Sequence, residues 1–224
     1  MKKELIEYLS QFAHENRVDL FNEKIEQRTN HVTLVLEDIY QAQNTSAAIR
    51  TSDCFGIQNV HVIENSNEFN VYKDITLGSS NWLNINKYNK EENNSKACFD
   101  SLKKQGYKIV ATSPLQHHDS VFEFSVDDKI ALVLGNELNG ISEIAKQEAD
   151  EFITIPMYGF TESFNISVSA ALCLSEISKR VRESDIDWKL SEEEKNDVLI
   201  KWYKHSIKHG KKLAKEFKKN FKEK

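Results

Sequence analysis

Short apolar runs alternate with amphipathic segments through most of this chain. The apolar runs are rich in β-branched residues, which predicts strands at 32–39, 59–64, 107–113, 129–135 and 151–157. Between these runs the apolar positions follow a helical spacing, which predicts helices at 44–55, 95–106, 141–149 and 166–182. Strands that alternate with helices predict an α/β fold with a mostly parallel sheet. Because the strands are apolar on both faces, we expect helices on both faces of that sheet.

The two ends of the chain differ from this alternating middle. The chain therefore has three predicted parts: a helical arm (1–28), an α/β domain (29–184) and a basic helical arm (185–224). The first residues, MKKELIEYLSQFAHENR, predict one amphipathic helix without the apolar core of a signal peptide. In the last arm, Ser191 and Glu194 predict a capping box, and lysines flank an apolar stripe of Leu213, Phe217 and Phe221.

Charge is distributed unevenly along the chain. The formal net charge is −5, yet residues 201–224 hold ten lysines against two glutamates, so this segment carries +8 and the remainder −13. A basic segment on an acidic body is expected of a contact with nucleic acid or a membrane surface, although a solvated helix face explains any lysine run equally well. No run of about 18 apolar residues occurs, so we expect no membrane span.

The cysteines and histidines give no sign of disulfide bonds or of a metal site. Cys54, Cys98 and Cys173 are odd in number and unclustered, and each falls in a predicted helix, which predicts small core residues. Neither CxxC nor HExxH spacing occurs, so no metal is expected.

Polar clusters follow three of the predicted strands. Parallel sheets bind ligands at the carboxyl ends of their strands, so each cluster is a candidate site. After the first strand, Asn44 or Thr45 is expected to cap a helix that carries Arg50 among apolar and small residues. An arginine buried there needs an anionic partner, which is either Asp53 or an anionic substrate.

The second and third clusters follow the predicted strands 129–135 and 151–157. The turn GNELNG contains two glycines that allow a ligand close to the backbone, but it matches neither GxGxxG nor a phosphate-binding loop with Lys-Ser/Thr. The third cluster places Ser163 and Asn165 before a helix whose first turns are small: Ser167, Ser169, Ala170 and Ala171. Small residues suit close packing against another helix, as in a dimer interface, but this does not explain the polar loop.

Together, the segments NTSAAIRT, LVLGNELNGIS and IPMYGFTESFNISVSAAL resemble the three motifs of the SPOUT superfamily, specifically of the TrmH-type tRNA and rRNA ribose 2′-O-methyltransferases. The resemblance covers about residues 28–182. It implies a trefoil knot formed by the second and third loops, with S-adenosylmethionine held in the knot largely by backbone groups. It also implies an obligate homodimer with the active site at the subunit interface.

The resemblance also implies roles for individual residues. Arg50 acts on the ribose 2′-hydroxyl, in a site shaped by Asn44, Glu137, Ser163 and Asn165. The cofactor pocket is lined by Thr112, Leu134, Gly135, Gly140, Ile155 and Phe164. Because the pKa of arginine is about 12 or higher, we expect Arg50 to position the hydroxyl and stabilise oxyanion charge, and the identity of the general base stays open.

The terminal helices resemble those of the tRNA guanosine-18 enzymes, which predicts tRNA as partner and a cytoplasmic location. The expected RNA contacts are Arg28, Lys201, Lys204, Lys208, Lys211 and Lys212. Asn81, where the family often has lysine, and Phe164, where it often has leucine, depart from the pattern. The alternatives are methylation of another tRNA or rRNA position, a non-catalytic RNA-binding protein on the same fold, and a nucleotide-binding α/β protein without methyl transfer.

Overall fold

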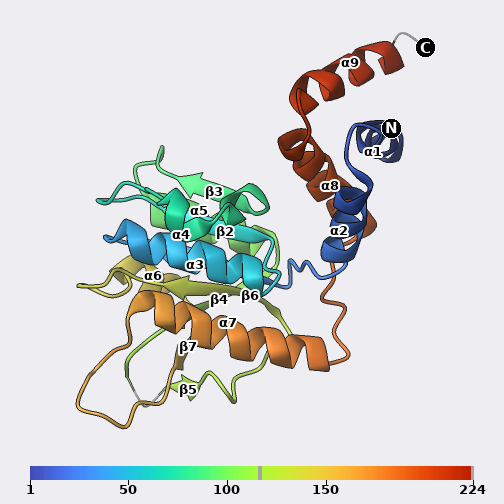
Figure 1. Cartoon of the computed structure of the whole chain (residues 1–224). Helices are drawn as coiled ribbons and strands as arrows, with labels where there is room; N and C mark the ends of the chain where they lie inside the picture. Colours follow the sequence, from blue (N-terminus) through green and yellow to red (C-terminus); the bar gives the residue numbers. More distant parts are fainter. Residues whose placement is uncertain (116–117, 223–224) are drawn as a thin grey trace. The chain divides into compact units, whose positions relative to one another are not determined.

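A computed structural model describes residues 1–115 and 118–222 (Figure 1). The chain divides into two compact units. One unit spans Thr29–Trp188, and the other combines Met1–Arg28 with the described residues from Lys189 onward. The second unit is therefore built from both ends of the chain.

The larger unit contains a parallel β-sheet. Within the described residues the sheet has seven strands in the order β3-β2-β1-β6-β4-β7-β5, and every pairing is parallel. The strands are β1 (Val32–Glu37), β2 (Asn59–Ile63), β3 (Asn84–Tyr88), β4 (Tyr107–Thr112), β5 (Asp119–Ser120), β6 (Lys129–Leu134) and β7 (Glu151–Thr154). The predicted parallel α/β fold is confirmed. The two edge strands, β3 and β5, were not predicted, because β3 is largely polar and β5 has only two residues.

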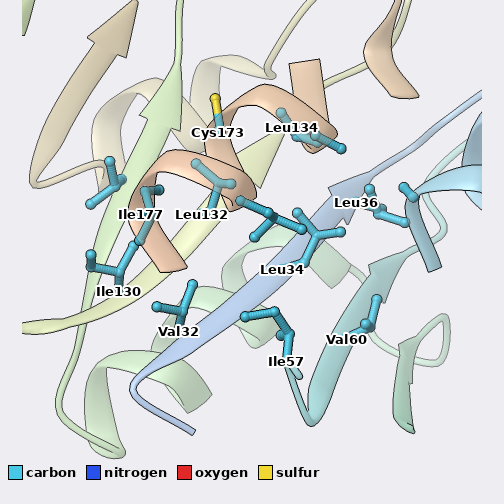
Figure 2. Packing of buried hydrophobic residues seen from close by; sticks show 14 of the residues in the cluster. Val32, Leu34, Leu36, Ile57, Val60, Ile130, Leu132, Leu134, Cys173 and Ile177 are labelled. Atoms are coloured by element: carbon cyan, nitrogen blue, oxygen red, sulfur yellow. The ribbon is translucent and has the colours of Figure 1, made fainter. Parts of the chain in front are cut away.

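Helices cover both faces of the sheet, as the two-sided apolar strands predict. On one face Leu34 and its neighbours pack against α3 (Ala42–Cys54) and α7 (Ile166–Glu183). Figure 2 shows part of this layer, in which Cys173 and Ile177 of α7 belong to the same cluster as the apolar side chains of β1 and β6. Val35 points the opposite way, toward α5 (Asn94–Lys104) and α6 (Glu143–Glu148). The period-2 alternation of a strand thus feeds two separate cores.

Helix α3 begins earlier than predicted. Its N-cap is Gln41, so Asn44 and Thr45 lie inside the first turn rather than at the cap. The Gln41 side chain accepts from Asn44 Nδ2 at 3.3 Å but makes no capping hydrogen bond to the helix backbone, and the carboxylate that accepts from Gln41 N comes from a distant loop. Gly56 follows the helix with φ of 75°, a left-handed conformation that glycine adopts without strain. After α3, the β2–β3 connection holds α4 (Lys73–Thr76) and the 3₁₀ turn η1 (Ser79–Asn81).

The smaller unit consists of α1 (Lys2–Ser10), α2 (Glu15–Ile25), α8 (Glu192–Ser206) and α9 (Gly210–Lys222). The single N-terminal helix of the prediction is wrong: the segment forms α1 and α2. Leu9 and Phe21 are buried, and 12 residues do not fit a whole number of helical turns, so one continuous helix would turn these residues to different sides. The capping box of Ser191 and Glu194 is confirmed at the start of α8.

Aromatic packing and ion pairs join the two ends of the chain in this unit. The ring of Phe21 lies 5.3 Å from that of Trp202 and 5.1 Å from that of Tyr203. The carboxylate of Glu26 lies 2.8 Å from Lys195 Nζ. The ring of Phe217, from the apolar stripe of α9, lies 5.1 Å from that of Tyr8 in α1.

Two further expectations have mixed outcomes. Cys98 and Cys173 are buried, as predicted, whereas Cys54 at the end of α3 is exposed and is not a core residue. Burial raises the pKa of the Cys173 thiol to about 12, so this thiol stays protonated and packs as an apolar side chain. In the part of the chain that the structure describes, no helix is both long and apolar enough to cross a membrane.

Candidate active site

A pocket of about 940 Å³ lies at the carboxyl ends of β4, β6 and β7. Ten of the predicted site residues line it: Asn44, Thr112, Leu134, Gly135, Glu137, Gly140, Ile155, Ser163, Phe164 and Asn165. They lie at or after the carboxyl ends of four different strands, β1, β4, β6 and β7, which meet because parallel strands end at one edge of the sheet. All six expected cofactor residues are therefore brought together around one cavity.

One wall of the pocket is a tight turn that only glycine permits. A Cβ on Gly135 would lie 2.3 Å from the carbonyl carbon of Gly140 and 2.3 Å from the amide nitrogen of Ile141. The turn is closed by Asn136 N donating to Gly140 O at 2.8 Å and Gly140 N donating to Asn136 O at 2.9 Å. Gly140 itself has φ of 68°. The turn therefore presents backbone, rather than side chains, to the cavity.

A hydrogen-bonded chain of side chains links the three motif segments. Asn165 Nδ2 donates to Asn44 Oδ1 at 3.1 Å, and Asn44 Nδ2 donates to Glu137 Oε1 at 2.7 Å. The carboxylate of Glu137 also accepts from the backbone amides of Tyr40 at 2.9 Å and Gln41 at 3.2 Å. Glu137 thus supplies the missing cap of α3, where a negative charge also complements the helix dipole.

The direction of this chain is fixed by chemistry. An ionised carboxylate only accepts hydrogen bonds, so Asn44 must turn its amide nitrogen toward Glu137 and its oxygen toward Asn165. Asn165 then uses its nitrogen on Asn44 and keeps its oxygen for Ser167, whose backbone amide donates at 2.8 Å and whose hydroxyl donates at 2.6 Å. Asn165 is the N-cap of α7. One network therefore starts both helices that flank the pocket.

The electrostatics of Glu137 agree with an ionised role. Burial alone would raise the pKa of this carboxyl, but the hydrogen bonds from Asn44, Tyr40 and Gln41 outweigh burial, and the net pKa lies below its ordinary value of 4.5. At neutral pH the group is a carboxylate, and the network keeps its direction.

Arg50 lies outside this pocket. The expectation that it is buried is wrong: the residue is exposed, and its Nη1 lies 3.5 Å from the carbonyl oxygen of Ile75 in α4. The buried positions of α3 include Thr45, Ala48, Ile49 and Ser52, and Arg50 lies off that face. The small residues around Arg50 in the sequence did not indicate this, because they lie on more than one side of the helix: Ala48 is buried, whereas Cys54 is exposed.

The expected RNA contacts divide into two groups. Arg28 is only 6% exposed and its guanidinium lies over the ring of Trp202 at 5.3 Å, so in this conformation it packs within the smaller unit and does not offer an RNA contact. Lys201 and Lys204 are half-buried, and burial lowers the pKa of each. The exposed members are Lys208, Lys211 and Lys212.

Three exposed lysines of α9 were missed by sequence reasoning. Lys215, Lys218 and Lys219 lie on the side of the helix opposite Leu213 and Phe217, together with Lys211 and Lys212. The 3.6-residue period of α9 could have identified them. No group of three His, Cys, Asp or Glu side chains suited to a metal ion occurs among residues 1–115 and 118–222.

Comparison with known proteins agrees with the three motifs. Residues 31–175 match the model of the SpoU rRNA methylase family. The chain belongs to this family. It is 42% identical over 201 residues to the tRNA (guanosine(18)-2′-O)-methyltransferase of Borreliella burgdorferi, covering 90% of each chain.

SpoU methylases of known structure share the fold. The crystal structure of the Aquifex aeolicus TrmH/SpoU tRNA modifying enzyme matches with a TM-score of 0.77 and 30% identity, covering 87% of this chain and 98% of that one. The SpoU methyltransferase AviRb from Streptomyces viridochromogenes, in complex with the cofactor AdoMet, matches with a TM-score of 0.58 over 72% of this chain and 62% of that one, and at 21% identity it supports the fold alone.

Proposed function

We propose that this SpoU methylase transfers a methyl group from S-adenosylmethionine to the ribose 2′-hydroxyl of guanosine-18 in the D-loop of tRNA. The observation that carries the proposal is the hydrogen-bonded chain from Asn165 through Asn44 to Glu137, which links three motif segments around one pocket. The guanosine-18 position rests on the names of the relatives from Borreliella burgdorferi and Aquifex aeolicus.

The pocket fits S-adenosylmethionine. Leu134, Ile155 and Phe164 supply apolar surface for a nucleoside, and the turn closed by Gly135 and Gly140 offers backbone groups without side chains in the way. When bound, this cofactor supplies an electrophilic methyl group on a sulfonium. Thr112 donates its hydroxyl to Val133 O at 3.1 Å and so holds the edge of β4 beside β6.

The chain's own residues would orient the nucleophile. With the five N–H donors of its guanidinium, Arg50 can hold a phosphate and the 2′-hydroxyl in one orientation. Such orientation converts a bimolecular encounter into an intramolecular one, which can account for much of the rate. The hydrogen bond from Asn165 to Asn44 ties the end of the third loop to α3. Which group accepts the hydroxyl proton is left to experiment.

A homodimer would complete the site, because Arg50 is absent from the pocket lining of its own chain. Large apolar side chains are exposed on the second and third loops and on α7, which suits an interface with a second copy: Leu138, Tyr158, Phe160, Phe164, Val168 and Leu172. In this arrangement Arg50 of one chain meets the pocket of the other.

We also propose the trefoil knot of the SPOUT fold. Arg180 of α7 donates to the carbonyl oxygens of Val121 at 3.3 Å and Phe124 at 2.6 Å, which ties α7 to the connection between β4 and β6. Insertion of β6 between β1 and β4 is also consistent with a chain end that passes through an earlier loop.

The lysine face of α9, formed by Lys211, Lys212, Lys215, Lys218 and Lys219, would bind tRNA phosphates. Within the described residues only Lys212 of this set forms an ion pair, with Glu216 at 3.8 Å. Replacing Lys211, Lys215 and Lys218 by glutamine is expected to weaken tRNA binding and to reduce the salt slope by about 0.7–0.9 per lysine. Because its substrate would be tRNA, we place the protein in the cytoplasm.

The test is methyl transfer from labelled S-adenosylmethionine to unmodified tRNA, with the product mapped by mass spectrometry. We expect 2′-O-methylguanosine at position 18, its loss in Arg50→Ala, and full activity in Lys104→Ala on the opposite face of the sheet. Label at another tRNA or rRNA position would support the alternative methylase. Cofactor binding without label on any RNA would favour a non-catalytic RNA-binding protein.

A further inference from the structure

A buried carboxylate lies directly behind the turn that forms the pocket wall. Glu37, the last residue of β1, is 2% exposed and does not line the pocket. Its Oε2 accepts from the backbone amide of Ser142 at 2.9 Å, and its Oε1 accepts from the hydroxyls of Ser142 at 2.8 Å and Ser95 at 2.6 Å. Ser142 ends the turn and is the N-cap of α6, with its hydroxyl accepting from Ala145 N at 3.0 Å.

The next residue holds the other end of the same turn. The carbonyl oxygen of Asp38 accepts from Asn136 Nδ2 at 2.7 Å. Asp38 has φ of 55°, and its own Oδ1 accepts from three consecutive backbone amides, those of Asn65, Ser66 and Asn67. Two adjacent residues, neither of which lines the pocket, therefore hold both the start and the end of segment 135–142.

We propose that Glu37 is a positioning residue for the cofactor-binding turn: its carboxylate holds Ser142 and thereby sets the shape of the pocket wall at 135–141. The inference rests on the proposed function, because it assigns S-adenosylmethionine as the ligand of that wall. The physical reason is the free-energy cost of a buried donor that has lost its acceptor. This cost exceeds the net contribution of the hydrogen bond to stability, so we expect the turn to move when residue 37 cannot accept from Ser142.

Residue 64 supplies a matched control. Glu64 follows the neighbouring strand β2, is 8% exposed, and accepts from the backbone amide of Phe69 at 2.6 Å and from Asn89 Nδ2. No hydrogen bond or ion pair of the Glu64 side chain reaches segment 135–142 within the described residues. Glu64→Met therefore removes a buried carboxylate of the same kind at the same edge of the sheet without touching the turn.

The experiment compares Glu37→Met, Glu37→Gln and Glu64→Met with the wild-type chain. Methionine preserves the length of the side chain and removes both acceptors, whereas glutamine keeps one acceptor for Ser142 N. Hydrogen exchange in 135–142 of the free protein is expected to rise about tenfold in Glu37→Met and to return close to wild type in Glu37→Gln. In Glu64→Met this segment is expected to exchange at the wild-type rate.

Ligand binding gives the second readout. Glu37→Met is expected to raise the Kd and the KM for S-adenosylmethionine about tenfold and to leave the KM for tRNA unchanged, while Glu64→Met changes neither. Ser142→Ala should weaken binding alone and add little to Glu37→Met, since both act through one contact. Equal exchange or equal cofactor Kd in Glu37→Met and Glu64→Met would overturn the proposal.

The two readouts separate the proposals from each other. If the wild-type chain fails to bind S-adenosylmethionine, the proposed function falls, and faster exchange of 135–142 in Glu37→Met alone still supports the positioning role. If the wild-type chain binds the cofactor but Glu37→Met neither loosens the turn nor weakens binding, the positioning role falls and the proposed function stands.

Discussion

Replacing Glu137 by glutamine tests whether a carboxylate is needed to start α3 and hold the pocket network. Three N–H donors converge on this group, from Tyr40, Gln41 and Asn44. A glutamine has one acceptor oxygen. Its best orientation keeps the bonds from Gln41 and Asn44 and turns its own amide hydrogens toward the Tyr40 N–H.

The cost follows from these contacts. A backbone donor without a partner costs about 1–3 kcal/mol when buried, and because Tyr40 is exposed to water the lower end applies. Losing the negative charge at the N-terminus of α3 adds about 0.3–1 kcal/mol. The two remaining bonds also weaken when their acceptor becomes neutral. We expect Glu137→Gln to lower the free energy of unfolding by about 2 kcal/mol.

The assay is urea unfolding followed by circular dichroism, with Glu23→Gln as control. Glu23 lies beyond the first turn of α2 and forms an exposed ion pair with Lys24 at 2.7 Å, so its loss should change stability by less than about 0.5 kcal/mol. The folded-state pKa of Glu137 is lowered, since hydrogen bonds outweigh burial, so its contribution is complete above 4.5 and is lost as the pH falls through the lower folded-state value. A Glu137→Gln variant as stable as the control at pH 7 would refute the reasoning.

Three other perturbations have defined outcomes. Burial lowers the pKa of His61 from 6.5 to about 4, so between these pH values the imidazole is protonated in the unfolded chain and neutral in the folded chain. The free energy of unfolding therefore falls by up to about 1.4 kcal/mol per pH unit as the pH drops from 6.5 toward 4. Parallel urea titrations at pH 7.5 and 5 should show that His61→Phe lacks this component; an equal fall in both proteins would contradict it. Gly135→Ala places a Cβ 2.3 Å from the carbonyl carbon of Gly140, which costs about 1–3 kcal/mol of folding free energy. Calorimetry should show S-adenosylmethionine binding weakened tenfold or more. Unchanged affinity would show that the turn can move without cost to the pocket. Tyr8→Ala removes the ring that lies 5.1 Å from the ring of Phe217, so hydrogen exchange should become faster in residues 210–222 and stay unchanged in residues 32–37. Unchanged exchange in α9 would mean that α1 does not stabilise α9.

The sequence predicts those parts of the fold where one residue pattern has one structural solution. Short apolar runs rich in β-branched residues, such as 32–39, favour central strands of a covered sheet, and β1 lies between β2 and β6. The edge strand β3 was not predicted, because none of its residues is buried and its largely polar sequence resembles that of a loop. The order of strands, with β6 between β1 and β4, leaves no trace in the pattern of either strand, since both neighbours are equally apolar.

The candidate site divides in the same way. Gly135, Glu137 and Asn165 follow strands and could be placed at one edge of the sheet from their positions alone. Glu137 caps α3, although it lies 93 residues after its partner Asn44 in that helix. This contact could not be predicted from the sequence, because capping rules concern only residues that are neighbours in the chain. The prediction that Arg50 is buried was also wrong, because a helix with small residues on several sides does not show in its sequence which side is buried.

The insertion of β6 between β1 and β4 has a consequence for how the chain is made. During synthesis β1 can pair with β2 early. The other edge of β1 pairs with β6, whose residues 129–134 are synthesised about 5–20 s after β1 at ordinary rates of elongation. Until then the nascent protein offers an open, apolar strand edge of the kind that recruits other chains. The ribosome-bound stage, rather than the finished enzyme, is therefore where this fold most needs protection from aggregation.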